Sequence, residues 1–253
     1  KRSTQDGKGV TMQMRLFPYT NSQLFSTHYL KTRVKQQLKE WKDDASARAA
    51  FKTLVAIYNK EKDSLEGYNE AQLEEHFIRP ILKNVLSHFF EVQESIFKTS
   101  RQPDYAFFPD DQTRRQALKD KGKKDFYRLA IAVGDAKRMS TPLSRKTRAG
   151  MYTIENPSLQ IDIYLRQTPP SWGILTDGQY WRLYCEKTSH RLDSYFEVDI
   201  FDIISKGDLD SFKYFYCFFH REAFVENETT AMCFLDRVYM GSIEYAKELG
   251  EEL

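Results

Sequence analysis

Charged side chains stand at the ends of two apolar segments of this chain. Asp104 opens the short apolar segment 104–108, and Asp135 and Lys137 close the longer run 126–137. Residues two apart in a strand point to the same face, so Asp135 and Lys137 share one face. If the two segments are strands that pair antiparallel, the start of one meets the end of the other, and Asp104 lies beside Asp135 and Lys137.

Two carboxylates and an ammonium group at one place suit a hard divalent cation. Asp104 and Asp135 would supply oxygen ligands to Mg²⁺, and the carbonyl of Ala136 a further one. Lys137 would orient or deprotonate an attacking water and offset the charge of a phosphate, while the bound metal polarises the phosphoryl oxygen. Without a cation the two carboxylates repel each other. The pattern therefore predicts dependence on Mg²⁺, with Mn²⁺ as a substitute.

Helical segments offer further polar groups. Gln160 and Tyr164 are four residues apart and therefore share a helix face. Glu70 and Glu74 have the same spacing beside an apolar stripe, and Glu75 is a third candidate. Acidic residues are favoured in a first helical turn in any case, so each glutamate is equally well explained as a solvated charge.

The elements that must position these groups follow from the hydrophobic periodicity. Helical spacing is found over 28–62, over 69–90 with a kink expected at Pro80, over 158–167 and over most of the chain after residue 200. Strand patterns cover 92–97, 104–108, 126–137 and a hairpin over 172–186 that turns at Asp177-Gly178. This order predicts an α/β fold, with a mixed central sheet flanked by helices and with helical N- and C-terminal extensions.

Three regions are expected along the chain. Residues 1–27 are predicted to be a flexible tail, 28–200 the core domain with its N-terminal helices, and 201–253 a helical connector. The chain starts without Met and stops inside a helical pattern that shows no cap. We therefore expect a fragment of a longer protein.

The amino-acid composition limits which classes of protein fit this chain. The 253 residues are 41% hydrophobic and carry a net charge of +2, so the chain can bury a core and shows no global preference for a charged partner. Three cysteines (Cys185, Cys217 and Cys233) form no CxxC pair and argue against a disulfide framework. No stretch is long and apolar enough for a membrane span, and there is no signal peptide.

Local charge favours a phosphate partner. The stretch 114–124 carries six basic side chains against one acid, Asp120, and 138–148 carries four and no acid. Such side chains give salt-sensitive binding that does not depend on sequence. The candidate DNA-binding residues are Arg138, Arg145, Lys146 and Arg148.

The combined motifs resemble a known family. Pro103-Asp104, Asp135-Ala136-Lys137 and the segment QIDIY at 160–164 are similar to the PD-(D/E)xK nuclease superfamily with its QxxxY extension. The segments NEAQLEEHFIRPIL and WGILTDGQYWRLY further resemble the N-terminal nuclease region of type I and single-chain type IIG restriction enzymes. The spacing between Asp104 and Asp135 is long for this pattern.

The resemblance implies a restriction-endonuclease-like fold and a Mg²⁺-dependent DNA endonuclease. Asp104 and Asp135 would be metal ligands and Lys137 the catalytic lysine, with Gln160 and Tyr164 as the QxxxY pair and a glutamate from the 69–90 helix. A methyltransferase and a target-recognition region would be covalently linked, outside this chain. The setting would be restriction of foreign DNA in a bacterial or archaeal cytoplasm, with a dimer for double-strand cleavage and no membrane partner.

Two other functions stay open from the sequence. The nuclease fold can be catalytically inactive and serve as a DNA-binding or scaffolding module of a defence complex. Alternatively, the chain is an α/β interaction domain whose aromatic C-terminal helices bind a protein. The aromatic run 212–219 is expected to be core or a docking face.

Overall fold

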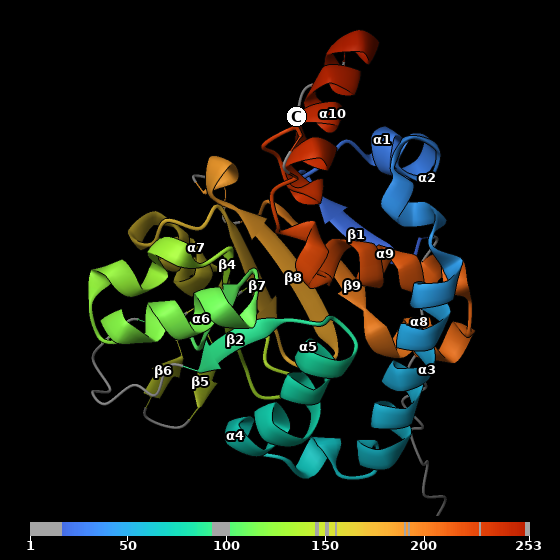
Figure 1. Ribbon diagram of the computed structural model, residues 1–253. Helices are drawn as coiled ribbons and strands as arrows, with labels where there is room; N and C mark the ends of the chain where they lie inside the picture. The colour runs from blue at the N-terminus through green and yellow to red at the C-terminus, as the bar shows by residue number, and fades with distance from the viewer. Residues whose placement is uncertain are drawn as a thin grey trace, which may run out of the picture.

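The protein is an α/β protein built on a seven-stranded mixed sheet (Figure 1). The computed structural model describes residues 17–92, 102–144, 147–149, 152–154, 156–189, 191, 193–227 and 229–250. The fold class expected from the sequence is thereby confirmed: helices flank a mixed sheet, and further helices lie near both ends of the chain.

The sheet has the strand order β1-β9-β8-β7-β4-β3-β2. Its strands are β1 (Tyr19–Ser22), β2 (Phe89–Val92), β3 (Tyr105–Phe108), β4 (Ala132–Ala136), β7 (Trp172–Thr176), β8 (Tyr180–Cys185) and β9 (Tyr195–Asp199). A separate small hairpin joins β5 (Thr147–Ala149) to β6 (Tyr152–Ile154). Only β4 and β7 pair in parallel among these strands, and the other neighbours pair antiparallel.

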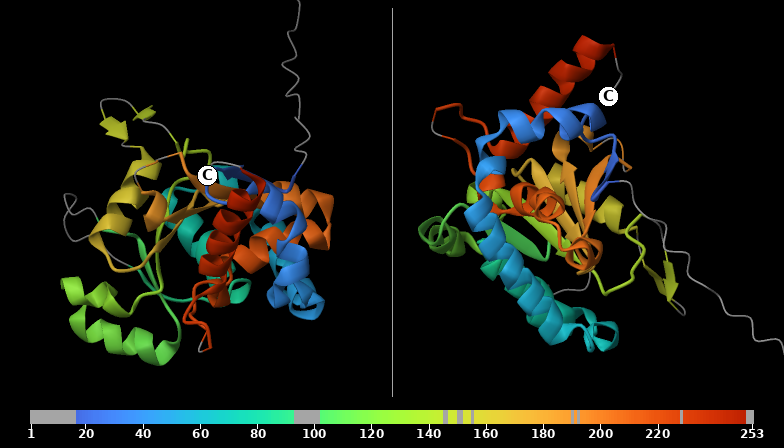
Figure 2. Two further views of the ribbon diagram at one scale, coloured as in Figure 1. Left: turned by 90° about the horizontal axis from the view of Figure 1, so that it is seen from above. Right: turned by 90° about the vertical axis from the view of Figure 1, so that its right-hand side faces the viewer.

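Helices cover both faces of the sheet. They are α1 (Thr27–Thr32), α2 (Val34–Gln37), α3 (Asp44–Glu61), α4 (Glu70–Leu73), α5 (Arg79–Asn84), α6 (Asp111–Ala117), α7 (Pro157–Gln167), α8 (Ile200–Lys206), α9 (Leu209–Phe219) and α10 (Phe234–Leu249). Figure 1 shows α6 and α7 on one side of the sheet and α3, α8 and α9 on the other. The far end of α10 projects beyond the body of the protein (Figure 2).

The two faces of the sheet contact different cores. Alternate strand residues such as Phe107, Trp181 and Phe196 pack with α3, α5 and α9 in the larger core, which we call the aromatic face. Their neighbours, among them Phe108 and Leu175, pack with α6 and α7 on the opposite side, which we call the α7 face. This alternation follows from the two-residue period of a strand.

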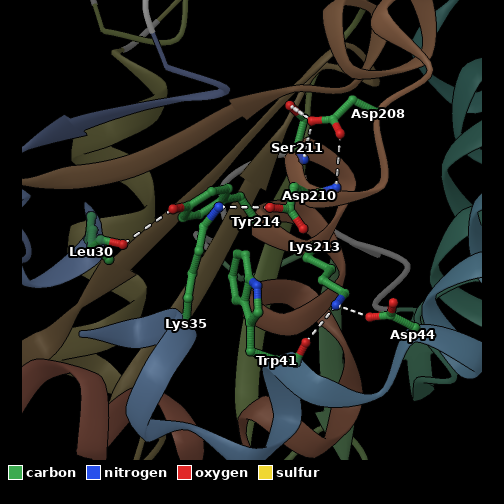
Figure 3. Close-up of polar contacts among 9 residues, drawn as sticks. All are labelled: Leu30, Lys35, Trp41, Asp44, Asp208, Asp210, Ser211, Lys213 and Tyr214. Atoms are coloured by element: carbon green, nitrogen blue, oxygen red, sulfur yellow. Dashed lines mark hydrogen bonds and ion pairs between the residues drawn. The ribbon is translucent and has the colours of Figure 1, made fainter. Parts of the chain in front are cut away.

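Helix α9 ties the aromatic face to the N-terminal helices. Lys213 is buried, donates a hydrogen bond to the Trp41 carbonyl at 2.6 Å and pairs with Asp44, and the Tyr214 hydroxyl donates to the Leu30 carbonyl at 3.2 Å (Figure 3). A buried ammonium needs such partners because burial of an unpaired charge is costly. The aromatic run 212–219 is therefore core in this structure, one of the two roles expected for it.

The long helix expected over 28–62 is broken. It consists of α1, α2, a 3₁₀ segment (Lys39–Lys42) and α3, and Leu38 between them is extended at φ −97° and ψ 120°. Asp43 then caps α3 by accepting a hydrogen bond from the Ser46 amide at 3.0 Å. An internal cap of this kind restarts the helix although the apolar spacing runs on.

The second expected helix, 69–90, is shorter and irregular. A π-helical segment, Glu74–Ile78, links α4 to α5. Pro80 has no amide hydrogen to donate to the carbonyl four residues earlier, which agrees with a local change of helix type at the expected kink. The chain leaves the helix after Asn84 and becomes strand β2, so the expected helix was too long at its C-terminal end.

Several strand expectations also needed correction. Strand β2 covers Phe89–Val92, so it begins before the strand expected over 92–97, and residues 93–97 of that expectation lie outside the described ranges. In the run 126–137 only Ala132–Ala136 is strand, because the chain up to Leu129 forms a 3₁₀ helix, Lys124–Leu129. By contrast, β3, α7 and the β7–β8 hairpin lie where the sequence predicts them, and Gly178 at the hairpin turn has φ +90°.

The ends of the chain differ from expectation where they are described. Tyr19–Ser22, which the sequence placed in a tail, is edge strand β1 and pairs with β9. Helix α10 has a C-terminal cap, since Gly250 follows it with φ +70°. All three cysteines are free, as expected.

Candidate functional site

The predicted meeting of Asp104 with Asp135 is built by the pairing of β3 with β4. The two strands are antiparallel, with Tyr105 opposite Gly134. Continuing this register by one residue puts Asp104 opposite Asp135. The Ala136 amide donates a hydrogen bond to Asp104 Oδ2 at 2.8 Å, which fixes the carboxylate at the end of β4.

Gly134 leaves room for the Phe107 ring of the neighbouring strand. A Cβ atom built at Gly134 would lie 2.8 Å from Cε2 of Phe107, so any side chain there would displace the ring. A glycine inside a strand often marks such a close approach.

Asp135 and Lys137 share the α7 face and form an ion pair between Oδ2 and Nζ. The Asp135 side chain is 1% exposed and that of Lys137 is 14% exposed. Asp135 Oδ2 makes no hydrogen bond of good geometry despite the ion pair. The pair is therefore mostly buried, with the ammonium as its more accessible member.

Electrostatics at the pair favour a charged Lys137. Burial raises the pKa of Asp135, Lys137 opposes this rise, and Asp104 adds to it. For Lys137, burial acts to lower the pKa, but the carboxylates of Asp135 and Asp104 outweigh it, so the pKa is raised. Lys137 is thus an ammonium group at neutral pH, which suits it to orient a water or a phosphate rather than to abstract a proton.

Of the three helix glutamates, Glu70 joins the pair. Its Oε2 accepts a hydrogen bond from the Arg138 amide at 3.1 Å, immediately after Lys137. Partial loss of hydration raises the pKa of Glu70; Lys137 opposes this rise and Asp104 adds to it. Helix α4 packs on the aromatic face, so Glu70 approaches the site around the end of β4.

Glu74 and Glu75 have other partners. Glu74 Oε2 accepts a hydrogen bond from the Tyr105 hydroxyl at 2.5 Å and lies 3.4 Å from Arg79. Glu75 pairs with Arg79 at 2.6 Å. Glu74 therefore fastens α4 to β3 next to Asp104, and Glu75 belongs to a surface ion pair away from the site.

Helix α7 brings Gln160 and Tyr164 onto the face that carries Asp135. Gln160 is half-buried, and its Oε1 is buried without a hydrogen bond. Tyr164 is 5% exposed and lines a cavity of about 620 Å³ together with Gln102 and Pro103, the residues that precede Asp104. The shared face is as predicted, and a direct role of either side chain at Lys137 stays a prediction.

The candidate DNA-binding residues are only partly described. Arg138 is exposed directly after the site. Arg145 and Lys146 lie outside the described residues, and for Arg148 the description covers only the backbone, in β5.

The other basic stretch, 114–124, is largely neutralised. Arg114 pairs with Glu91 and Asp111, and Lys123 lies 3.1 Å from Asp120. Because these ion pairs offset its positive charge, the stretch 114–124 is a weaker candidate for binding phosphate.

The donor set at the strand ends suits a magnesium ion that keeps several waters. Across the residues that the structure describes, no three His, Cys, Asp or Glu side chains gather as a complete protein cage. Mg²⁺ needs only one or two carboxylates. Asp104 and Asp135 supply them, and strand geometry turns the Ala136 carbonyl to the same side as its amide, toward Asp104.

Sequence reasoning missed the residues beside this site on β7 and β8. The Lys137 amide donates to the Thr176 carbonyl at 2.8 Å, which brings Asp177 next to Lys137. Arg182 and Glu197 form a buried ion pair at 2.6 Å on the same face. Asp177 and Arg182 inside the segment WGILTDGQYWRLY could have indicated a polar site here, because charged residues are uncommon in buried strands.

No helix in the described ranges is long and apolar enough to cross a membrane. Comparisons of the chain with protein-family models, with curated proteins and with solved structures find no match.

Proposed function

We propose that this chain is a Mg²⁺-dependent DNA endonuclease domain of the PD-(D/E)xK type, from a restriction–modification or phage-defence enzyme. The observation that carries the proposal is the convergence of Asp104, Asp135 and Lys137 at the ends of two antiparallel strands. Glu70 at the same place and the half-buried Gln160 on the facing helix add to it.

The chain's own residues would divide the work. The Lys137 ammonium is held by Asp135 and is accessible enough to bind a phosphate oxygen or to orient the attacking water. Asp104 and Asp135 would hold the metal, and Arg138 would contact the DNA backbone. A bound Mg²⁺ would supply Lewis-acid stabilisation of the charge that develops on the phosphate.

The raised pKa of Lys137 shapes this division of roles. An ammonium group cannot act as a general base, so proton removal falls to another group or to bulk water. The lysine instead contributes positive charge in a poorly hydrated site, where charge stabilisation is strongest. The sequence left two roles open for Lys137, to orient the attacking water or to deprotonate it. We propose the first of these roles.

The wider setting is part of the proposal. A linked methyltransferase and target-recognition region, a cytoplasmic location in a bacterium or archaeon, and dimerisation for double-strand cleavage all follow from the resemblance of the motifs.

The experiment is plasmid cleavage by the purified chain with Mg²⁺, with Mn²⁺ and with a chelator. We expect cleavage only with metal, and Asp135→Asn and Lys137→Ala should each lower the rate by at least about a hundredfold. Asp125→Asn and Lys52→Ala are matched controls, because both remove an exposed charge outside the site.

The alternatives give different outcomes. Salt-sensitive DNA binding without cleavage under any metal condition would identify an inactive DNA-binding module. Full cleavage by Asp135→Asn would contradict the proposed site.

A further inference from the structure

A second polar site lies beside Lys137 on the neighbouring strand. The parallel pairing of β4 with β7 sets Ala136 beside Thr176, and one residue further the same register puts Lys137 beside Asp177. Both side chains belong to the α7 face, since each is two residues from a residue of that face. Asp177 is 1% exposed.

A cavity of about 300 Å³ opens at Asp177. Its polar lining comes from the segment that follows Lys137 and from β7, β8 and β9: Ser140, Thr141, Asp177, Tyr180, Arg182 and Glu197. The volume lies at the lower end of the range for small-molecule sites, which suits a single planar ring system.

Two of the charged side chains in the cavity wall, Arg182 and Glu197, neutralise each other, and Asp177 is the third. Arg182 Nε lies 2.6 Å from Glu197 Oε2, and the guanidinium lies over the Tyr195 ring at 4.1 Å from its centroid. Arg182 also donates to Ser144 Oγ at 2.5 Å, which holds the segment after Lys137 against the sheet. The ion pair thus gives the cavity a rigid polar floor.

Asp177 has one oxygen in use and one without a partner. Its Oδ1 accepts hydrogen bonds from the amides of Gln179 at 3.1 Å and Tyr180 at 2.7 Å. Within the described residues Oδ2 makes no hydrogen bond, although the side chain is almost wholly buried. Burial, with a smaller contribution from Glu197, raises the pKa of Asp177 to about 6. A ligand that donates a hydrogen bond would satisfy Oδ2.

These features narrow the class of ligand. A phosphate is disfavoured because the Asp177 carboxylate lines the cavity without a counter-charge, whereas Glu197 and Arg182 offset each other. A divalent cation is disfavoured because no three-ligand group surrounds the cavity in the described structure. A neutral planar ring with an N–H donor remains, and carboxylates accept hydrogen bonds from the amino groups of nucleobases. Thymine has no amino group, and its one N–H lies between two carbonyl oxygens that a carboxylate repels.

We propose that this cavity receives one nucleobase of the substrate DNA next to the cleaved phosphate and selects bases that carry an exocyclic amino group over thymine. The inference rests on the proposed nuclease function, because the phosphate at Lys137 brings the base to the cavity. The base must leave the duplex stack, as in other proteins that bind an extruded base in a pocket. Asp177 would be a specificity-determining residue and would take no part in the cleavage step.

The test is to sequence the ends of plasmid fragments cut by the wild type and by Asp177→Asn. The wild type should disfavour thymine at one fixed position beside the cut by about tenfold. Asn keeps the oxygen that caps the turn but can present an N–H donor in place of Oδ2. Asp177→Asn should therefore abolish or reverse this bias.

A second variant and a control guard against misfolding. Thr141→Leu fills the cavity from the loop side and should also abolish the bias, whereas the exposed Asp125→Asn should keep it. Normal cleavage with no bias at any fixed position, or a bias that Asp177→Asn leaves intact, would overturn the inference and leave the nuclease proposal standing.

If the wild type does not cleave DNA, the nuclease proposal fails. The proposed base specificity of the cavity is then tested by nucleoside binding. Deoxycytidine and thymidine are then titrated in metal-free buffer and followed by NMR. Tighter binding of deoxycytidine that is lost in Asp177→Asn would support a nucleobase site, and equal shifts for both nucleosides would overturn it.

Discussion

The two faces of the central sheet differ in what they bury. On the aromatic face, rings from β8, β9 and α9 pack together, with the rings of Phe196 and Phe218 stacked at 4.6 Å between centroids. On the α7 face, the strands bury charged groups: Asp135 of β4, Arg182 of β8 and Glu197 of β9. Consecutive residues of one strand can thus serve stability on one side and chemistry on the other.

The difference is sharpest within a single strand. In β8, Trp181 and Leu183 belong to the aromatic face, while Arg182 between them pairs with Glu197. Burial of charge stabilises a fold little or not at all compared with apolar packing. On the aromatic face the buried ammonium of Lys213 joins helix α9 to the N-terminal helices, whereas on the α7 face the strands themselves bury charges. We therefore expect the α7 face to serve binding or catalysis.

The largest effect on stability is expected on the aromatic face. Phe218→Ala removes a fully buried ring and should lower the free energy of unfolding by about 4 kcal/mol. Urea denaturation measures this change. Cleavage per folded molecule should stay within about twofold, and a selective loss of cleavage would show that the two faces are not separate.

On the α7 face, breaking the buried ion pair should cost nearly as much. Glu197→Leu leaves Arg182 buried without a counter-charge and should destabilise the fold by about 3 kcal/mol. The double variant Arg182→Met, Glu197→Leu removes both charges and should recover much of this loss. If the double variant is as unstable as the sum of Glu197→Leu and Arg182→Met, the two side chains have no coupling energy, which would contradict this account of the pair.

The aromatic face also predicts how stability depends on pH. His88 is buried and its Nε2 lies 2.7 Å from the Phe219 carbonyl, and burial lowers the pKa of His88 to about 3. Below pH 6.5 His88 binds a proton in the unfolded chain but stays neutral in the folded protein. The contribution of His88 to the free energy of unfolding is therefore complete above pH 6.5 and declines as the pH falls toward 3.

One such histidine changes the free energy of unfolding by about 1.4 kcal/mol per pH unit between about pH 6 and 4. His88→Gln should reduce the measured slope by this amount. A smaller slope in the same direction should persist, because burial also lowers the pKa of His220 to about 4. An unchanged slope would show that His88 is protonated in the fold.

The smallest effect is expected at the helix that carries Glu70. Asn69 and Gln72 form a reciprocal cap at the start of α4, with hydrogen bonds of 2.9 and 3.1 Å. Asn69→Ala should lower stability by about 1 kcal/mol and cleavage by a few-fold. Asn69→Asp keeps the capping oxygen and should restore both, so a cleavage loss common to both variants would point to a different role for Asn69.

The local parts of this architecture could be predicted from sequence. Strand β3, helix α7 and the β7–β8 hairpin carry their own periodicity and turn residues. The pairing of Asp104 with Asp135 was also predicted, because an antiparallel neighbour brings strand start to strand end. The shared face of Asp135 and Lys137 followed from their two-residue spacing alone, and the structure adds the ion pair between them.

The remaining parts depend on tertiary contacts that no local pattern encodes. The parallel pairing that sets Asp177 beside Lys137 joins strands separated by the whole of α7. The break near Leu38 depends on caps and packing at α3, although the apolar spacing continues through it. Which glutamate reaches the site depends on tertiary partners: Glu70 accepts from the Arg138 amide, whereas Glu74 and Glu75, in the π-helical segment, contact Tyr105 and Arg79.

The central claim is that Asp104, Asp135 and Lys137 act as one unit. The most direct measurement is the Mg²⁺-dependent cleavage rate of Asp135→Asn, Lys137→Ala and the double variant. Residues that act together are strongly non-additive, so the double variant should be no slower than about tenfold below the slower single variant. Losses that multiply, or a single variant that cleaves like the wild type, would contradict the account.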